Sequence, residues 1–366
     1  MRICYIADAG SIHTRRWVSY FAGKGHQVHI ITSRPGKGYS EGVQLHLLTS
    51  LLPPHWKRAG YINTLPWFVQ ARRLINRIKP DIIDAHYITI NGYLAAFSGF
   101  HPLVLTAWGS DVLTDSKKGV LRLLTRYALK RAEMVTCNSE TVRNELIKLG
   151  VNPAKVSIIY QGIDMQKFSP EQGKKFKDRL GLQRRSVVIS IRSFKPVYNL
   201  EVLIRAIPLV LKHVPQASFI IAGEGEQREY LENLASSLGC SENIRFVGRI
   251  AHDELPKYLA SSDIYVSTSL SDSASLSLQE AMACELAPVV TDLLGNREWI
   301  TDGENGFLVP TNDIKALANK IVHLLKNRET GKKFGRLGRK IIQERAEYER
   351  EMERVERLYE RVVAKG

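Results

Sequence analysis

Short apolar segments alternate with segments of helical periodicity along nearly the whole chain of 366 residues. Seven strand-like segments occupy the first half, at 2–7, 27–32, 43–48, 82–85, 102–106, 133–137 and 156–160. Six more occupy the second half, at 186–191, 217–222, 243–247, 263–267, 287–291 and 306–309. Helical spacing lies between them, at 14–25, 65–79, 119–132, 140–149, 199–213, 225–238, 253–261, 275–284 and 313–327. Strands that alternate with helices predict parallel sheets covered by helices on both faces.

The alternation stops at a polar, lysine-containing stretch, 161–181, and starts afresh near residue 186. A chain of this length also exceeds what one ordinary core accommodates. We therefore predict an α/β protein with two doubly wound, Rossmann-like domains, 1–168 and 169–345, that face each other across a cleft and bind ligands at the carboxyl ends of their strands. The remaining segment, 346–366, is rich in Glu and Arg and predicts one amphipathic helix.

The net charge of +15 is unevenly distributed. Residues 1–180 contain 26 Lys and Arg against 12 Asp and Glu, whereas residues 181–366 contain 26 against 25. This excess predicts that the first half faces an anionic partner, which the charge alone leaves open as nucleic acid, an anionic membrane surface or a phosphate-bearing substrate.

The absence of targeting signals and of cysteine motifs from the sequence argues against several classes of protein. No stretch reaches the ~18–20 apolar residues of a membrane span, and the N-terminus lacks the regions of a signal peptide, so we expect a cytoplasmic protein. The four cysteines show no CxxC or Cys/His spacing, which indicates neither a disulfide framework nor a zinc site.

A serine-rich turn follows the predicted strand 263–267 and leads into a helix. The start of a helix presents free backbone N–H groups and a positive dipole end, which suit a phosphate group. Asp272 lies before this helix and Glu280 about two turns into it, and carboxylates are good partners for sugar and ribose hydroxyls. By itself the pattern is equally typical of a capped structural helix.

Several motifs, in order, make the chain resemble the retaining GT-B glycosyltransferases of family four. The serine-rich segment with Glu280-Ala281-Met282-Ala283-Cys284 is similar to the signature of that family, in which two glutamates eight apart precede an EAMACG run. The resemblance covers essentially the whole chain, and its further landmarks are Gln161-Gly162-Ile163-Asp164, Ala222-Gly223-Glu224-Gly225, Phe246-Val247-Gly248-Arg249, Gly295-Asn296-Arg297-Glu298 and Asp302-Gly303-Glu304-Asn305-Gly306-Phe307.

The resemblance implies roles for residues of the second domain. Glu280 would bind the nucleotide ribose, and Asp272 would bind hydroxyls of the donor sugar in the slot where the family usually has Glu. The backbone N–H groups from Ser275 to Ser277 would hold the diphosphate. Other implied donor-binding residues are Gly223, Glu224, Gly248, Arg249, Ser273 and Leu276, with Gly10 and Ser11 from the first domain.

Arg192 ends the first strand of the second domain, where the family places an arginine. Cleavage of a sugar–diphosphate bond builds negative charge on the leaving oxygen, which a fixed cation stabilises. The family carries a lysine about five residues later, but Val197 stands here, so Lys195 is the nearest cation and we assign it the second catalytic role.

In the first domain, Gly10 and Ser11 form the turn after the first strand, and His13 follows at the helix start. No GxGxxG motif is present, which argues against a dinucleotide-binding site. By resemblance, His86 after the strand 82–85 would face the cleft as a catalytic or acceptor-binding residue. Implied acceptor contacts are His13, His86, Trp108, which replaces a common family histidine, and Asp111, for which capping of the following helix is the alternative.

The resemblance also implies the reaction. The expected enzyme is a hexosyltransferase-type glycosyltransferase that retains the anomeric configuration, needs no cofactor and has no metal site, because the sequence shows no DxD-like cluster. Its donor would be a nucleotide sugar, a UDP-sugar rather than a GDP-sugar, and its acceptor a glycan or lipid-linked hydroxyl in cell-envelope or polysaccharide biosynthesis. In the family, the terminal helix returns to the first domain.

The basic, aromatic segments 51–79 and 117–131 suggest a peripheral protein on anionic lipid at the inner face of the cell membrane. The alternative is an ordinary helix with a basic solvent face. Two other functions stay open: a GT-B nucleotide-sugar epimerase or hydrolase, and a catalytically impaired glycan-binding protein. No nucleic-acid recognition module is visible, so we predict no nucleic-acid partner.

Overall fold

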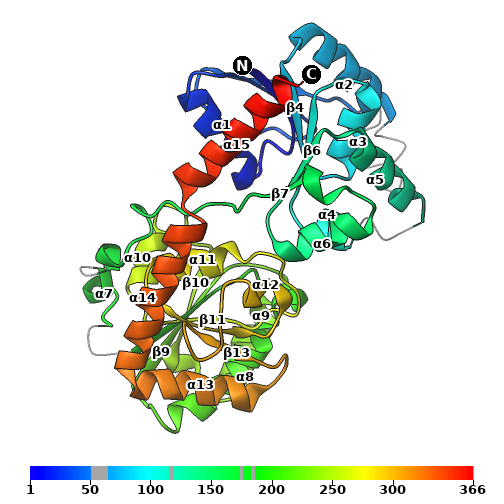
Figure 1. The fold of residues 1–366 in the computed structure, drawn as a ribbon. Coiled ribbons are helices and arrows are strands. Elements are labelled where there is room, and N and C mark those ends of the chain that lie inside the picture. The colour runs from blue at the N-terminus through cyan, green and yellow to red at the C-terminus, as the bar shows by residue number, and fades with distance from the viewer. Residues whose placement is uncertain (51–64, 115–118, 174–175, 183–185, 366) are drawn as a thin grey trace. The chain divides into compact units, whose positions relative to one another are not determined.

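The computed structural model describes residues 1–50, 65–114, 119–173, 176–182 and 186–365. These residues form two compact units (Figure 1). Unit 1 contains Met1–Gln161 together with Arg350–Gly366, and unit 2 contains Gly162–Glu349. Each unit is built on one parallel sheet with flanking helices, which confirms the predicted two-domain, Rossmann-like α/β fold.

Unit 1 contains a seven-stranded sheet in the order β3-β2-β1-β4-β5-β6-β7. Its strands are β1 (Arg2–Ile6), β2 (Gln27–Thr32), β3 (Val43–Leu47), β4 (Ile82–His86), β5 (Leu103–Ala107), β6 (Met134–Cys137) and β7 (Val156–Ile158). Its helices are α1 (Ile12–Gly23), α2 (Leu65–Ile78), α3 (Ile90–Ser98), α4 (Ser110–Leu113), α5 (Gly119–Arg131) and α6 (Glu140–Lys148). The central strands β4 and β5 are buried throughout, as apolar strands covered on both faces must be.

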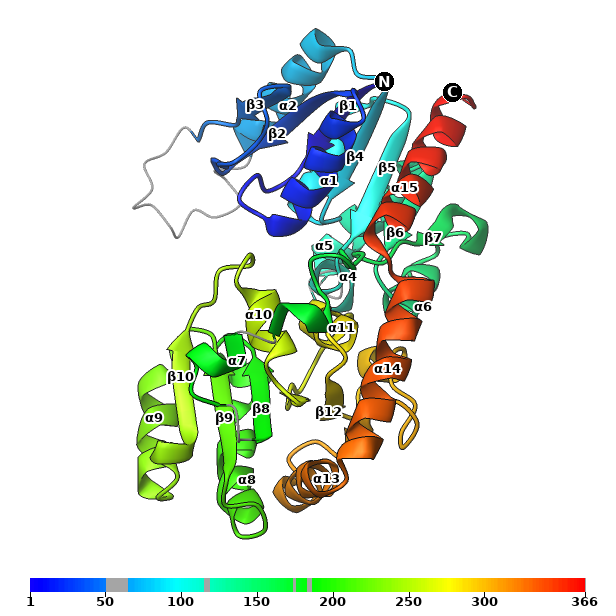
Figure 2. The same ribbon diagram turned by 90° about the vertical axis from the view of Figure 1, so that its left-hand side faces the viewer.

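Unit 2 contains a six-stranded sheet in the order β10-β9-β8-β11-β12-β13. Its strands are β8 (Ser186–Ile191), β9 (Ala217–Ala222), β10 (Ile244–Gly248), β11 (Ile264–Ser267), β12 (Ala287–Thr291) and β13 (Phe307–Val309). Its helices are α7 (Phe176–Arg179), α8 (Leu200–Leu211), α9 (Arg228–Ser237), α10 (Leu255–Ala260), α11 (Leu276–Ala283), α12 (Leu294–Arg297), α13 (Ile314–Lys326) and α14 (Arg328–Arg345). Figure 2 shows helices α8 and α9 beside strands β8, β9 and β10.

Each of the two sheets has one topological switch point, where the strand order reverses. It lies between β1 and β4 in unit 1 and between β8 and β11 in unit 2. Strands on either side of such a point send their connections to opposite faces of the sheet, which leaves a crevice at their carboxyl ends. This geometry directs attention to the residues that follow these four strands.

The predicted C-terminal helix, 346–366, corresponds to α15 (Tyr348–Val363), whereas the helix α14 before it was not predicted. α14 ends at Arg345, and α15 begins after a break. At this break Ala346 and Tyr348 bond to the backbone of Ile163, through Ile163 N–H to Ala346 O at 2.7 Å and Tyr348 N–H to Ile163 O at 3.0 Å. Those strand-like bonds use backbone groups that a continuous helix would have engaged internally.

From Arg350 onward α15 belongs to unit 1. Its buried side chains recur at helical spacing, and they are Met352, Val355, Leu358, Tyr359 and Val362. The Tyr359 ring stacks on Phe21 with centroids 5.2 Å apart, and its hydroxyl donates to the fully buried carboxylate of Asp84. Burial and the neighbouring Asp84 raise the pKa of Tyr359 well above its usual value, so this phenol keeps its proton.

Helix α3 was not among the predicted helices. Six of its nine residues are buried, including Gly92 and Tyr93. A helix enclosed on most sides lacks the polar stripe from which amphipathic spacing is recognised. No helix in the described part of the chain is long and apolar enough to cross a membrane.

Substitution Tyr359→Phe tests the attachment of α15 to unit 1. It removes the hydrogen bond to a buried carboxylate, so the free energy of unfolding should fall by about 1.5–3 kcal/mol, measured by urea denaturation. Tyr127→Phe, which removes a hydroxyl from a side chain that is 42% exposed, should change it by less than about 0.5 kcal/mol. Equal effects of the two substitutions would contradict the assigned role of Tyr359.

Candidate active site

The switch point of unit 2 places Arg192 beside the loop that precedes α11. Arg192 directly follows β8, and the neighbouring strand β11 continues through residues 268–275 into that helix. Both segments therefore leave the same edge of the sheet, as the parallel pairing requires. The sequence-predicted residues Arg192, Asp272 and Ser275 meet at this edge.

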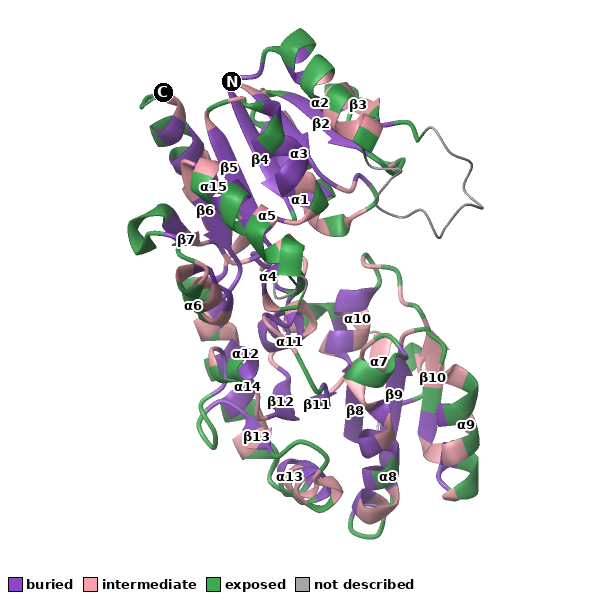
Figure 3. Cartoon of the chain, turned by 90° about the vertical axis from the view of Figure 1, so that its right-hand side faces the viewer, coloured by how far each residue is buried: buried purple, intermediate pink, exposed green. Residues whose placement is uncertain are grey.

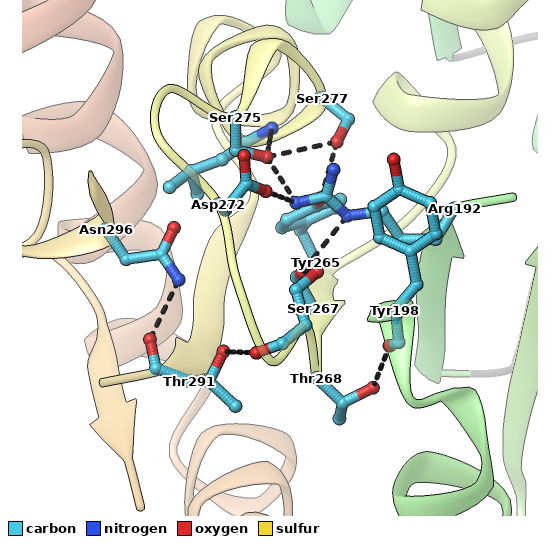
Figure 4. Close-up of polar contacts among 12 residues, drawn as sticks. Arg192, Tyr198, Tyr265, Ser267, Thr268, Asp272, Ser275, Ser277, Thr291 and Asn296 are labelled. Atoms are coloured by element: carbon cyan, nitrogen blue, oxygen red, sulfur yellow. Dashed lines mark hydrogen bonds and ion pairs between the residues drawn. The ribbon is translucent and has the colours of Figure 1, made fainter. Parts of the chain in front are cut away.

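The Arg192 guanidinium bonds to three parts of this loop (Figure 4). Its terminal nitrogen donates to the Asp272 carboxylate and to Ser275 Oγ, the latter at 2.6 Å. Its Nε donates to Ser267 Oγ at 3.1 Å, at the end of β11. The guanidinium also lies 5.2 Å from the centre of the Tyr198 ring, within cation–π distance. Arg192 is thus held in place by side chains of the protein itself.

Arg192 stays charged although it is largely enclosed. Burial by itself would lower the pKa of the guanidinium, but Tyr265, Asp272 and Tyr198 around it act in the opposite direction, and the pKa is raised above its usual value. A fixed cation with little access to water interacts strongly with an anion that enters the site. The pair with Asp272 means that such an anion must compete with an internal carboxylate.

Three loops that the sequence analysis assigned to the donor are hydrogen-bonded to one another. Arg192 N–H donates to Ala222 O at 3.0 Å, and Gly223 N–H donates to Gly248 O at 2.8 Å. Gly223 has a φ of +146°, and a Cβ there would lie 2.0 Å from the carbonyl oxygen of Arg192. Glycine is therefore required for the backbone after β9 to lie against the Arg192 segment.

The loop before α11 is anchored from both sides. Thr268 Oγ1 donates to Tyr198 O at 3.1 Å, and Leu270 N–H donates to Val197 O at 2.8 Å. On the other side Thr291 Oγ1 donates to Ser269 O at 2.7 Å, which Figure 4 also shows. These bonds hold the position of Asp272 relative to the sheet.

The start of α11 is lined by serine hydroxyls. Ser275 is the N-cap residue, and its Oγ accepts from Leu278 N–H at 3.4 Å. Tyr265 Oη and Ser277 Oγ lie 2.8 Å apart. The remaining N–H groups of the first turn have no partner within the helix. The arrangement presents hydroxyl and amide donors next to a guanidinium, which is a donor set suited to phosphate oxygens.

Glu280 is buried on α11 and bonded to a residue that the sequence analysis missed. His252 Nε2 lies 3.1 Å from its carboxylate, and Lys167 Nζ lies 3.1 Å from His252 Nδ1. Because a lysine ammonium only donates, Nδ1 is the acceptor, and Nε2 carries the hydrogen that is donated to Glu280. The signal available in the sequence was a histidine four residues beyond Gly248, in a loop already assigned to the donor.

The other predicted donor residues have little internal bonding. The side chains of Lys195, Glu224 and Arg249 are exposed, and Ser273 and Leu276 are half-buried. Lys195 lies on the same loop as Arg192, so the structure places the two predicted cations on one segment. Among the described residues, no group of three His, Cys, Asp or Glu side chains has an arrangement that could hold a metal ion.

The switch point of unit 1 contains an aromatic cluster around His86. This side chain is buried, and neither ring nitrogen has a hydrogen-bond partner; Nε2 lies 3.6 Å from Asp84 Oδ2. The rings of Trp17, Tyr5 and Trp108 surround it, with centroids at 4.9, 5.3 and 5.5 Å. An unpartnered buried imidazole is costly unless a ligand satisfies it, which is typical of a functional site.

His13 extends this cluster from the start of α1. Its ring stacks on Trp108 with centroids 4.7 Å apart. Burial, with Arg16 and His86 nearby, lowers the pKa of His13 to about 4, so its imidazole is neutral at physiological pH. The predicted acceptor residues His13, His86 and Trp108 thus form one continuous surface of rings.

Three other predicted residues of unit 1, Asp111, Ser11 and Gly10, take part in hydrogen bonds that hold the local backbone. The buried carboxylate of Asp111 accepts from Ile88 N–H and Gly109 N–H, both at 2.9 Å, and so joins the loops that follow β4 and β5. This is the cap-like role named as its alternative. Ser11 is the N-cap of α1, and Gly10 N–H donates to Asp8 Oδ1 at 2.8 Å.

Two family models match successive parts of the chain. Residues 2–139 match the model described as glycosyl transferase 4-like, and residues 172–341 match glycosyl transferases group 1. The boundary between the matches falls within the stretch where the structure passes from unit 1 to unit 2.

Characterised proteins and solved structures show the same likeness. The chain is 26% identical over 97% of its length to N-acetyl-alpha-D-glucosaminyl L-malate synthase of Bacillus anthracis, of which it covers 95%. It is 27% identical over 75% of its length to the Escherichia coli UDP-Gal:alpha-D-GlcNAc-diphosphoundecaprenol alpha-1,3-galactosyltransferase, covering 73% of that protein. Sucrose-phosphate synthase from Thermosynechococcus elongatus matches with a TM-score of 0.84 at 19% identity, with full coverage of both chains. Anabaena HepE in complex with UDP matches with a TM-score of 0.81 at 19% identity, with 98% of this chain and 99% of that chain covered.

Substitution Gly223→Ala tests the close approach of the two donor loops. The new Cβ would clash with the Arg192 carbonyl oxygen. A strained backbone alone costs about 1–3 kcal/mol, and the free energy of unfolding should fall by more than that. Gly239→Ala is the matched control, because Gly239 has a φ of +66° but open space around it, and should cost about 1–2 kcal/mol. Urea denaturation of the two variants measures the difference, and a smaller loss for Gly223→Ala would refute the packing argument.

Proposed function

Because the chain belongs to the group 1 glycosyltransferases of the GT-B fold, we propose that its donor is a nucleotide-diphosphate sugar bound in unit 2 and that its acceptor hydroxyl is bound in unit 1. The observation that carries this proposal is the fixed Arg192 beside the serine-lined start of α11. A guanidinium, hydroxyl groups and helix N–H groups converge where a diphosphate would find charge and hydrogen-bond donors together.

Nucleotide binding would exchange one ion pair for another. In the structure Arg192 is bonded to Asp272. An entering diphosphate would take over the guanidinium, and Asp272 would turn to hydroxyls of the donor sugar. In the transition state the guanidinium would stabilise the charge that develops on the leaving phosphate. Glu280, held by His252, would bind the ribose.

The proposed transfer retains the anomeric configuration. The bond between the anomeric carbon and the diphosphate oxygen breaks while the acceptor oxygen bonds to the same face of that carbon. The acceptor proton passes to an oxygen of the leaving phosphate. In the proposed complex both carboxylates of the unit 2 site are engaged, Asp272 by hydroxyls of the donor sugar and Glu280 by His252 and the ribose. This engagement favours a route without a protein nucleophile.

The donor is proposed to be a UDP-sugar, and the transfer to need no metal or cofactor. UDP occupies the related HepE structure, and UDP-Gal is the donor in the name of the Escherichia coli relative. A mycobacterial relative at 28% identity is named for GDP-mannose, so the base must be tested directly. The cations at the site belong to the protein itself, and transfer should therefore persist in EDTA.

The acceptor is proposed to be a glycan or lipid-linked molecule of cell-envelope or polysaccharide biosynthesis, used by a cytoplasmic enzyme at the inner membrane face. The ring surface of His13, Trp108 and His86 supports a site for a flat, partly apolar ligand face with a hydroxyl near the unpartnered imidazole. Several relatives have names that include lipid-linked acceptors, such as diphosphoundecaprenol and phosphatidylinositol monomannoside.

Arg192→Ala should lower the rate of donor turnover, measured as release of nucleotide diphosphate, by about 10²–10³-fold, because it removes the charge that stabilises the leaving group. Arg192→Lys keeps the charge but loses the forked geometry and should lie in between. Arg205→Ala, at an exposed ion pair on α8 in the same unit, is the control and should retain full turnover. A thermal-shift screen of UDP-, GDP- and ADP-sugars identifies the donor to be used. Turnover of Arg192→Ala within a few fold of the unmodified enzyme would refute the assignment.

Asp272→Asn should separate nucleotide binding from sugar transfer. Removal of the competing carboxylate leaves Arg192 free for the diphosphate, so UDP should bind more tightly, by about tenfold for each 1.4 kcal/mol of competition removed. The sugar loses its carboxylate partner, so the extra affinity of UDP-sugar over UDP and the rate of transfer should both fall. Isothermal titration with UDP and with UDP-sugar measures these changes. Weaker binding of UDP to Asp272→Asn would exclude the proposed exchange.

A further inference from the structure

Exposed apolar side chains gather on three neighbouring helices of unit 1. Of the sixteen large apolar side chains exposed in the described residues, seven lie on α2, α3 and α5. They are Leu65, Val69, Ile90, Phe97, Val120, Leu123 and Tyr127, of which Val120 is 71% and Leu123 67% exposed. Figure 3 shows the exposed faces of α2 and α5 in green. Contiguous apolar surface of this kind marks an interaction site more often than scattered residues do.

A groove of about 480 Å³ runs among these helices. Its lining comes from all three helices and consists of Leu65, Phe68, Ile90, Tyr93, Phe97, Leu121 and Leu124. Aromatic contacts join its walls, because Phe97 lies 5.6 Å from Phe68 on α2 and 4.8 Å from Tyr127 on α5, between ring centres. The volume falls within the range of about 300–1,000 Å³ that is typical of ligand pockets.

The one polar side-chain group that lines the groove already has hydrogen-bond partners within the protein. The lining has one hydroxyl, that of Tyr93, which bonds to Thr125 Oγ1 at 2.8 Å and to Leu121 O at 3.2 Å. An extended peptide in the groove would bury backbone groups without partners, which is costly. A hydrocarbon chain carries no such groups and therefore fits the lining better.

The charged side chains of α2, α3 and α5 all have one sign. The three helices together contain seven Lys and Arg and no Asp or Glu. Arg72 and Arg73 on α2 are exposed, as are Arg122, Arg126 and Lys130 on α5. Cations that surround an apolar surface attract anionic headgroups, and their long side chains reach the phosphates while the apolar residues meet the chains.

We propose that α2, α3 and α5 form a lipid-docking surface, in which the groove takes a hydrocarbon chain from an anionic bilayer and the surrounding cations bind its phosphate headgroups. The inference deepens the proposed function, since it rests on the lipid-linked acceptor suggested there. Ile90, which lines the groove, lies only four residues beyond His86. The groove therefore belongs to the same unit as the acceptor cluster.

The sequence analysis reached a membrane hypothesis from segments 51–79 and 117–131. Residues 51–64, with Trp56 and Lys57, and residues 115–118, with Lys117 and Lys118, lie outside the described residues. The docking surface proposed here uses only residues 65–78, 90–98 and 119–131.

Co-sedimentation with vesicles tests the docking surface. The full chain should bind vesicles of phosphatidylcholine with phosphatidylglycerol at physiological salt, bind vesicles of phosphatidylcholine alone much more weakly, and lose affinity as salt is raised. Arg122→Glu with Arg126→Glu should reduce binding by about tenfold or more. Leu65→Ser with Phe97→Ser, at exposed positions of the groove, should reduce it to a similar degree.

Matched controls separate the docking surface from general charge and hydrophobicity. Lys212→Glu and Leu294→Ser change exposed residues of unit 2 in the same way and should leave vesicle binding intact. Failure of the unmodified chain to bind anionic vesicles, or equal losses in the controls, would overturn the proposal, as would binding only to an acidic protein. Donor turnover without vesicles should be unchanged in the docking variants, so this result is independent of the test of Arg192.

Discussion

Every strand pair in both sheets is parallel, so each sheet has one edge at which all of its strands end. The strand order reverses once in each sheet. The carboxyl ends of the two strands beside that point are not covered by a connecting segment. The guanidinium of Arg192 lies at this point in unit 2, and the imidazole of His86 lies at the corresponding point in unit 1. The parallel direction of the strands, together with their order, thus determines where ionisable side chains can contact a ligand.

The two sheet edges carry different chemistry because different groups satisfy them. In unit 2, hydrogen bonds among loops fix a cation, a carboxylate and hydroxyls, so the site is suited to a charged group. In unit 1, aromatic rings surround the His86 imidazole, which has no hydrogen-bond partner, and burial lowers the pKa of the neighbouring His13, whose ring is therefore uncharged near neutral pH. A preorganised cation in one unit and an imidazole without a hydrogen-bond partner in the other are the features on which the proposed donor and acceptor sites rest.

Periodicity predicted all thirteen strands to within two residues at their ends, because apolar strands between polar turns are local features. It missed α3, which is buried on most sides, and it missed α14. It did not reveal the bonds that separate α14 from α15, because their partner Ile163 lies far away in the sequence. Motif resemblance assigned Arg192, Asp272 and Glu280 to one site, and the structure joins Arg192 to Asp272. The resemblance did not reveal this bond, or that His252 holds Glu280, because a pattern of residue types contains no distances between side chains.

The return of α15 to unit 1 has a consequence for the order of folding during synthesis. Unit 2 is one uninterrupted stretch and has its complete set of contacts once residue 349 has left the ribosome. Unit 1 is discontinuous. The buried carboxylate of Asp84 bonds to the phenol of Tyr359, which is synthesised 275 residues later. The core of unit 1 is therefore completed after that of unit 2, and its helix-covered sheet remains partly open to water, or to a chaperone, until α15 has been made.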